Sequence, residues 1–185
     1  MFISAAVAAH EGQDVAKFDI PGAYLHIETD KDVIIFLEGA LSEIMGKVAL
    51  KIYRKYIIMI IRGQQLLYVK IQKAFHGLLC SALMFYRKLA KDLEAYGFHI
   101  KTYVPCVAKS MKKYKQMKVV WHVDGLKLSH VDSFEITKFA GYLSRIYGRI
   151  TVYRIKVHEY LGIDLDYSKQ GTVKVSMIKY LDSVL

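Results

Sequence analysis

The sequence predicts a single α+β domain over residues 1–185, in which helices cover one face of an antiparallel sheet. Three observations lead to this class. Strand-like and helix-like segments follow in the order strand, strands, helix, hairpin, helix, hairpin. The hydrophobic fraction of 54% is sufficient for a substantial core. No Pro- or Gly-rich linker divides the chain, and its two prolines, Pro21 and Pro105, stand at predicted turns.

The first half of the chain is predicted to form one short helix and four strands. An apolar run ending at Asp19 is a strand, because Pro21-Gly22 follows it as a stop signal. Two further apolar runs flank Arg62-Gly63-Gln64 and predict a hairpin. In chain order the predicted helix is residues 2–10, and the predicted strands are residues 15–19, 33–37, 52–61 and 66–71.

The second half contains the clearest helices and a tight hairpin. Apolar residues recur every three or four positions over Ser81–Tyr96, and Gly97 supplies a stop signal. The run Trp121–Leu128 predicts a hairpin with Asp124-Gly125 as its turn. The spacing of Asp132 and Glu135 predicts a capping box at the start of the next helix, which ends at Gly148. Strands over residues 160–167 and 172–176 and a helix over residues 178–185 complete the prediction.

Net charge, apolar runs and cysteine content limit which binding partners and which cellular compartment are expected for this chain. The net charge of +10 favours a polyanionic partner, either nucleic acid or an acidic membrane face. The run Ile57–Ile61 is far too short to span a bilayer, so no membrane partner is expected. Cys80 and Cys106 have no metal-ligand spacing, and two isolated thiols fit a reducing compartment. Residues 1–9 lack the basic start of a signal peptide, so an intracellular location, in cytoplasm or nucleus, is expected.

Two acidic residues stand at the ends of predicted strands. Asp19 ends the first strand, and Asp124 lies at the turn of the later hairpin. Two carboxylates at strand ends can converge on one divalent metal site, which a polymerase needs to clamp the attacking and leaving oxygens. The alternative is structural, because an Asp before a Pro turn and an Asp-Gly hairpin turn are both common without any catalytic role.

Six ordered blocks of the chain resemble the reverse transcriptase domain of copia-type LTR retrotransposon polyproteins. The match covers nearly the whole chain, and six blocks in order are more specific than any one of them. The blocks are Phe18–Leu25; Tyr68–Lys70 with Lys73–Leu78; Phe85–Leu89 with Tyr96–Phe98; Pro105–Val107; Trp121–Leu126; and His158–Ile163.

The resemblance implies a polymerase palm with part of the fingers, without a separate RNase H or integrase domain. It implies RNA-directed DNA polymerase activity on a template-primer of RNA or DNA with dNTP as substrate. Asp19 and Asp124 would be the catalytic metal ligands for Mg²⁺ or Mn²⁺. The implied substrate-binding residues are Tyr24, as a steric gate against the 2′-hydroxyl, and Lys70 and Lys73; the implied primer-holding residues are Leu161, Gly162 and Ile163.

One position departs from the family pattern. The second acid of the family's hairpin motif is replaced by Gly125, which predicts a loss of roughly two or more orders of magnitude in rate. The chain therefore resembles a degenerate, truncated copy. The alternatives are a catalytically inactive, basic nucleic-acid-binding relic and a small α+β domain that binds no nucleic acid.

Overall fold

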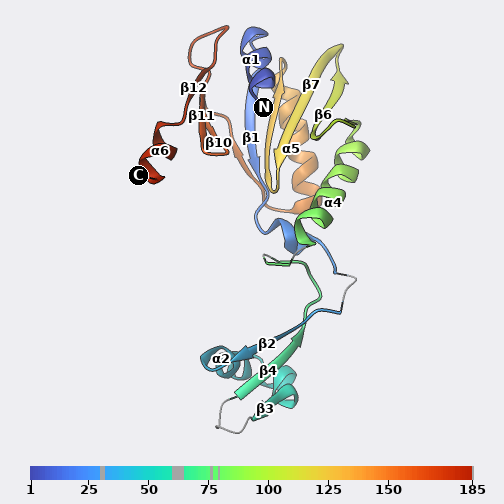
Figure 1. Cartoon of the computed structure of the whole chain (residues 1–185). Helices are drawn as coiled ribbons and strands as arrows, with labels where there is room; N and C mark the ends of the chain where they lie inside the picture. The colour runs from blue at the N-terminus through green and yellow to red at the C-terminus, as the bar shows by residue number, and fades with distance from the viewer. Residues whose placement is uncertain (30–31, 60–64, 76, 79, 185) are drawn as a thin grey trace. The chain divides into compact units, whose positions relative to one another are not determined.

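The computed structural model describes residues 1–29, 32–59, 65–75, 77–78 and 80–184 (Figure 1). The chain divides into two compact units. Met1–Ala23 and Ala82–Leu185 form the first unit, and Tyr24–Ser81 forms the second. The prediction of one domain over the whole chain stays a prediction. Within the described ranges, no helix is long and apolar enough to cross a membrane.

A six-stranded antiparallel sheet is the centre of the first unit. Its strand order is β5-β6-β7-β8-β1-β9, so β1 lies between two strands that follow it much later in the sequence. The strands are β1 (Asp14–Asp19), β5 (His99–Lys101), β6 (Val104–Lys112), β7 (Lys115–His122), β8 (Gly125–His130) and β9 (Thr151–Tyr153).

Two long helices, α4 (Ser81–Tyr96) and α5 (Ser133–Tyr147), pack on one face of this sheet. Phe18 of β1 meets Phe139 of α5 edge-on at 5.6 Å between ring centroids, and Trp121 of β7 stacks on Tyr86 of α4 at 6.1 Å. Phe18 and Trp121 both pair with Leu126, so they share a face. The predicted α+β class, with helices on one face of an antiparallel sheet, is confirmed.

A second, three-stranded sheet lies against part of the other face. Tyr160 of β10 places its hydroxyl 3.4 Å from the carbonyl oxygen of Gly125. Ala5 of the N-terminal helix packs with Ile163 and Leu165 in a small buried cluster. The elements are α1 (Phe2–His10), β10 (Val157–Tyr160), β11 (Ile163–Asp166), β12 (Lys174–Ser176) and the C-terminal α6 (Ile178–Val184).

The second unit is built on a small sheet of order β2-β4-β3. The Ser42 hydroxyl of α2 donates to the Gln65 carbonyl of β4 at 3.0 Å. A Cβ at Gly46 would lie 3.0 Å from Ile57 Cδ1, so glycine permits this close helix–sheet contact. The elements are η1 (Ala23–His26), β2 (Ile34–Glu38), α2 (Ala40–Val48), α3 (Leu50–Tyr53), η2 (Arg54–Tyr56), β3 (Ile57–Met59) and β4 (Gln65–Lys70).

Two predicted strands differ from the structure. The strand predicted over residues 52–61 begins as helix, and only Ile57–Met59 is extended. Its spacing of apolar residues fits a short helix as well as a strand. The rest of that strand and the turn predicted at residues 62–64 lie outside the described residues. The strand predicted over residues 160–167 is broken in two by Leu161-Gly162.

Candidate functional site

The two aspartates predicted as metal ligands come from neighbouring strands of the six-stranded sheet. Asp19 is the last residue of β1, and its cross-strand partner is Gly125 at the start of β8. One residue further on, the Ile20 N–H donates to the carbonyl of Asp124 at 3.2 Å. Both aspartates are half-buried. The backbone therefore brings together two carboxylate-bearing positions that lie far apart in the sequence.

The hairpin turn that carries Asp124 lies one residue earlier than predicted. His122 and Gly125 are the last cross-strand pair of β7 and β8, so the turn residues are Val123 and Asp124 rather than Asp124 and Gly125. Val123 has φ 51°, which is unfavourable for a β-branched residue. The register that pairs His122 with Gly125 leaves Val123 in the turn, where its positive φ strains the backbone.

Gly125 has room for a larger side chain. A Cβ at this position would lie 3.6 Å from the His122 carbonyl oxygen and 3.9 Å from Tyr160 Cε2, which are ordinary contacts. Directly opposed residues of an antiparallel pair point to the same face. A carboxylate at position 125 would therefore leave the sheet on the same face as Asp19.

The donor set at this end of the sheet suits a hard divalent cation only in part. Carboxylate oxygens are the ligands that Mg²⁺ prefers, and one or two of them with substrate phosphates form its usual site. Asp19 and Asp124 supply two such groups. In the part of the chain that the structure describes, no three His, Cys, Asp or Glu residues gather into a metal site. A cation held by these two groups alone would need further oxygen ligands to complete its coordination.

Leu161 and Gly162, predicted as part of a primer-holding strand, instead form a hairpin turn. They connect the paired residues Tyr160 and Ile163. Their φ angles of 56° and 72° are both positive, as a type I′ turn requires. Gly162 also permits a close approach, because a Cβ there would lie 3.1 Å from Tyr180 Cδ2. The strand assignment is wrong, and the primer-holding role stays a prediction.

The predicted substrate-binding residues Tyr24, Lys70 and Lys73 lie in the second unit. The Tyr24 carbonyl in η1 accepts from the Ile27 N–H at 3.1 Å. Lys70 ends β4, and its Nζ lies 2.5 Å from Asp32 Oδ1, a contact that lowers the pKa of Asp32. Lys73 is exposed and forms an isolated β-bridge with Glu28. Their roles in substrate binding stay predictions.

Lys127 and His158 are among the buried titratable side chains that sequence reasoning did not find. Lys127 of β8 is 2% exposed, and burial with the nearby charge of Lys118 lowers its pKa to about 8. His158 of β10 is also 2% exposed. Alternation with Leu126 and Leu128 indicates that Lys127 faces away from the helices, but a sequence pattern does not show that another sheet covers that side.

No protein-family model and no curated protein matches the chain. Among solved structures it is similar to apo telomerase from Candida tropicalis, with 12% identity and a TM-score of 0.48 over 93% of this chain and 35% of that chain. It is also similar to telomerase from Candida albicans in complex with the TWJ fragment of telomeric RNA, with 11% identity and a TM-score of 0.49 over 95% and 34%. The chain spans about a third of the length of these structures.

Proposed function

We propose that this chain is a reverse-transcriptase-like polymerase palm with part of the fingers, of the copia retrotransposon type. Its reaction would be RNA-directed DNA synthesis with Asp19 and Asp124 as the ligands of Mg²⁺ or Mn²⁺. The observation that supports this most strongly is the register of β1 and β8. Asp19 pairs with Gly125, and the Ile20 N–H donates to the Asp124 carbonyl. This register brings the backbones of the two positions to one end of neighbouring strands, which supports the proposal that their carboxylates share a metal site.

Each implicated residue has a distinct task in this proposal. Asp19 and Asp124 supply negative oxygen ligands, and the bound cations would stabilise charge on the transferring phosphate. Tyr24 would exclude the 2′-hydroxyl of the incoming nucleotide, while Lys70 and Lys73 would contact phosphates. The turn at Leu161-Gly162 would support the primer end. The net charge of +10 favours association with the polyanionic template-primer.

Gly125 favours a second candidate, an inactive nucleic-acid-binding relic of such a polymerase. Without a third carboxylate the site carries less negative charge for holding two dications and a triphosphate. Catalysis of phosphoryl transfer depends on positioned charge, so binding of nucleic acid would persist after the rate is lost. The two candidates therefore differ in whether restoring an acid at position 125 restores the reaction.

Primer extension with Mg²⁺ or Mn²⁺ tests the proposal, using the parent chain, Gly125→Asp and the uncharged, nearly isosteric control Gly125→Asn. We expect Gly125→Asp to extend a primer about 100-fold faster than the parent, by analogy with one electrostatic stabiliser. Gly125→Asn should extend the primer no faster than the parent chain does. Fluorescence of Trp121, the only tryptophan, reports whether the six-stranded sheet is intact in each variant.

A folded Gly125→Asp protein without primer extension in either metal would contradict the polymerase proposal. Salt-dependent retardation of a primer-template by all three proteins, with no extension by any of them, would favour the relic. Electron paramagnetic resonance of added Mn²⁺ gives an independent readout. Gly125→Asp should bind Mn²⁺ more tightly than Gly125→Asn if Asp19 and position 125 face one cation site.

A further inference from the structure

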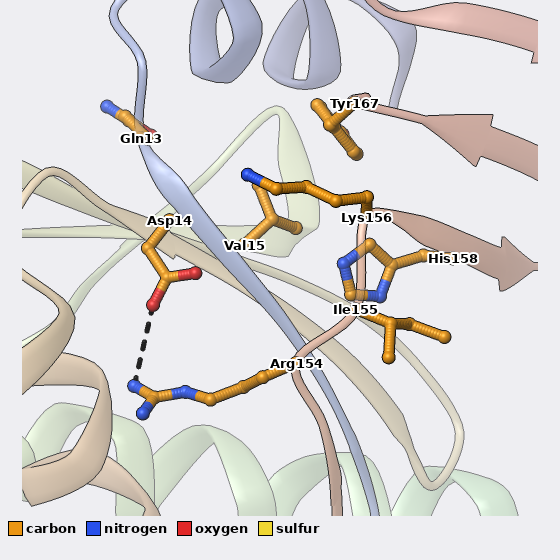
Figure 2. Close-up of a pocket in the computed structure, with 8 residues that line it drawn as sticks. All are labelled: Gln13, Asp14, Val15, Arg154, Ile155, Lys156, His158 and Tyr167. Atoms are coloured by element: carbon orange, nitrogen blue, oxygen red, sulfur yellow. Dashed lines mark ion pairs between the residues drawn. The ribbon is translucent and has the colours of Figure 1, made fainter. Parts of the chain in front are cut away.

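A small pocket in the first unit lies between the start of β1 and the chain that enters and leaves the β10–β11 hairpin (Figure 2). Its volume is about 160 Å³, which is room for several water molecules or one small oxyanion. It lies at the opposite end of β1 from Asp19. Its polar lining comprises Gln13, Asp14, Arg154, Lys156, His158 and Tyr167.

Three of these side chains carry buried polar atoms without a hydrogen-bond partner. His158 is 2% exposed, and neither ring nitrogen has a partner. The Val15 backbone lies near enough to the ring to influence its protonation, but it does not meet hydrogen-bond geometry. The Tyr167 hydroxyl and Gln13 Oε1 are likewise buried and unpartnered. Such groups are costly when unsatisfied, so three of them around one pocket make it a site that would hold water or a polar ligand.

The charge around the pocket favours an anion. Arg154 lies 3.6 Å from the Asp14 carboxylate and compensates it, as the dashed line in Figure 2 shows. Lys156 has no carboxylate within ion-pair distance in the described ranges of the chain. Its side chain extends across the pocket toward β1 (Figure 2). The local excess charge is therefore positive.

Burial and the charge of Lys127 lower the pKa of His158. At neutral pH the ring is then uncharged and offers one N–H donor and one acceptor nitrogen. The Tyr167 hydroxyl adds a donor, and Gln13 Oε1 adds an acceptor for a protonated oxygen. Monohydrogen phosphate presents both kinds of partner, since it has three acceptor oxygens and one O–H donor.

We propose that this pocket binds a phosphate group, either as the free ion or as the terminal phosphate of a nucleic-acid strand. Lys156 supplies the charge, and His158 and Tyr167 donate to the phosphate oxygens. A neighbouring hollow of about 380 Å³ shares Gln13, Lys156 and Tyr167 and has room for the rest of a terminal nucleotide. The proposal does not depend on catalysis by Asp19 and Asp124.

Calorimetric titration of the full chain with inorganic phosphate at pH 7 tests this proposal. EDTA is included, so a failure of the polymerase proposal would leave the result unaffected. Tyr167→Phe removes only the unpartnered hydroxyl, and Lys156→Ala removes the uncompensated charge. Lys101→Ala is the matched control, because it removes one exposed positive charge from the far end of the six-stranded sheet.

We expect the parent chain to bind phosphate saturably. Tyr167→Phe and Lys156→Ala should each weaken the affinity for phosphate about tenfold or more, whereas Lys101→Ala should change it by less than about twofold. Competition with oligonucleotides of one sequence, carrying either a 5′-phosphate or a 5′-hydroxyl, identifies the source. Displacement only by the phosphorylated strand supports a strand end, and displacement by neither supports the free ion. Absence of saturable phosphate binding, or equal loss in all three variants, would overturn the proposal.

Discussion

Replacement of Lys127 by methionine should stabilise the first unit at neutral pH. Lys127 lies on β8 between Leu126 and Leu128 and is 2% exposed. Burial, and then the charge of Lys118, lower its pKa from 10.5 to about 8. In the described part of the chain no carboxylate lies within ion-pair distance of it. Methionine keeps an unbranched chain of similar length and removes the buried ammonium group.

The sign and size of the effect follow from proton linkage. Between pH about 8 and about 10.5 the unfolded chain holds the Lys127 proton and the folded chain does not, so stability rises with pH. The slope is about 1.4 kcal/mol per pH unit, which gives a total of about 3 kcal/mol over that range. Tyr167, whose pKa burial raises to about 12, opposes this rise above pH about 10. Burial also lowers the pKa of Lys118 and raises the pKa of Cys106, so the contribution of Lys127 is isolated by comparing the parent with Lys127→Met over pH 8 to 10.

Guanidinium unfolding followed by Trp121 fluorescence at pH 7, 8, 9 and 10 measures this effect in the six-stranded sheet. We expect Lys127→Met to be more stable than the parent at pH 7 by up to about 3 kcal/mol, with most of the rise between pH 8 and 10 removed. Lys101→Met, with the same charge change on an exposed strand, should retain that rise. A Lys127→Met protein that is less stable at pH 7, or that keeps the full pH slope, would refute the reasoning.

Two further variants test strain and coupling in the same unit. Val123→Asn should stabilise the hairpin by about 1 kcal/mol in thermal unfolding, because asparagine tolerates the φ of 51° better than valine; an unchanged or lower Tm would argue against backbone strain. Tyr147→Phe should destabilise the unit by about 1–3 kcal/mol, because it removes the 2.5 Å hydrogen bond from α5 to the Asp92 carboxylate of α4. Equal guanidinium midpoints for parent and variant would show that this bond is not needed.

Local patterns were sufficient wherever an element depends on its own residues. The helix over Ser81–Tyr96 has the predicted bounds, because its apolar spacing and Gly97 specify both a buried face and an end. The backbone contact between the end of β1 and the Asp124 hairpin also agrees with the antiparallel pattern of the sequence, because Asp19 ends one strand and Asp124 lies in the turn of a later hairpin. Acidic residues at the ends and turns of predicted strands therefore indicate which positions approach each other before the full fold is known.

Features that depend on a second element could not be predicted from local pattern. Asp132 accepts from the Phe134 N–H at 2.9 Å as an N-cap should, but Glu135 pairs with Lys138 at 3.0 Å instead of completing the capping box. The hairpin turn lies one residue earlier than predicted because β7 and β8 pair His122 with Gly125. The burial of Lys127 depends on the second sheet covering its face. In each case a second element or a competing charge decides the outcome.

The place of β1 in the middle of its sheet has a consequence during synthesis on the ribosome. About 105 residues must be added after Asp19 before Gly125 exists, which takes roughly 5–20 s at ordinary translation rates. Throughout that interval the nascent β1 has neither of its final neighbours, β8 and β9. Its apolar segment is then exposed to wrong partners, so yield from an expressing cell should depend on chaperone supply more than the stability of the finished fold suggests.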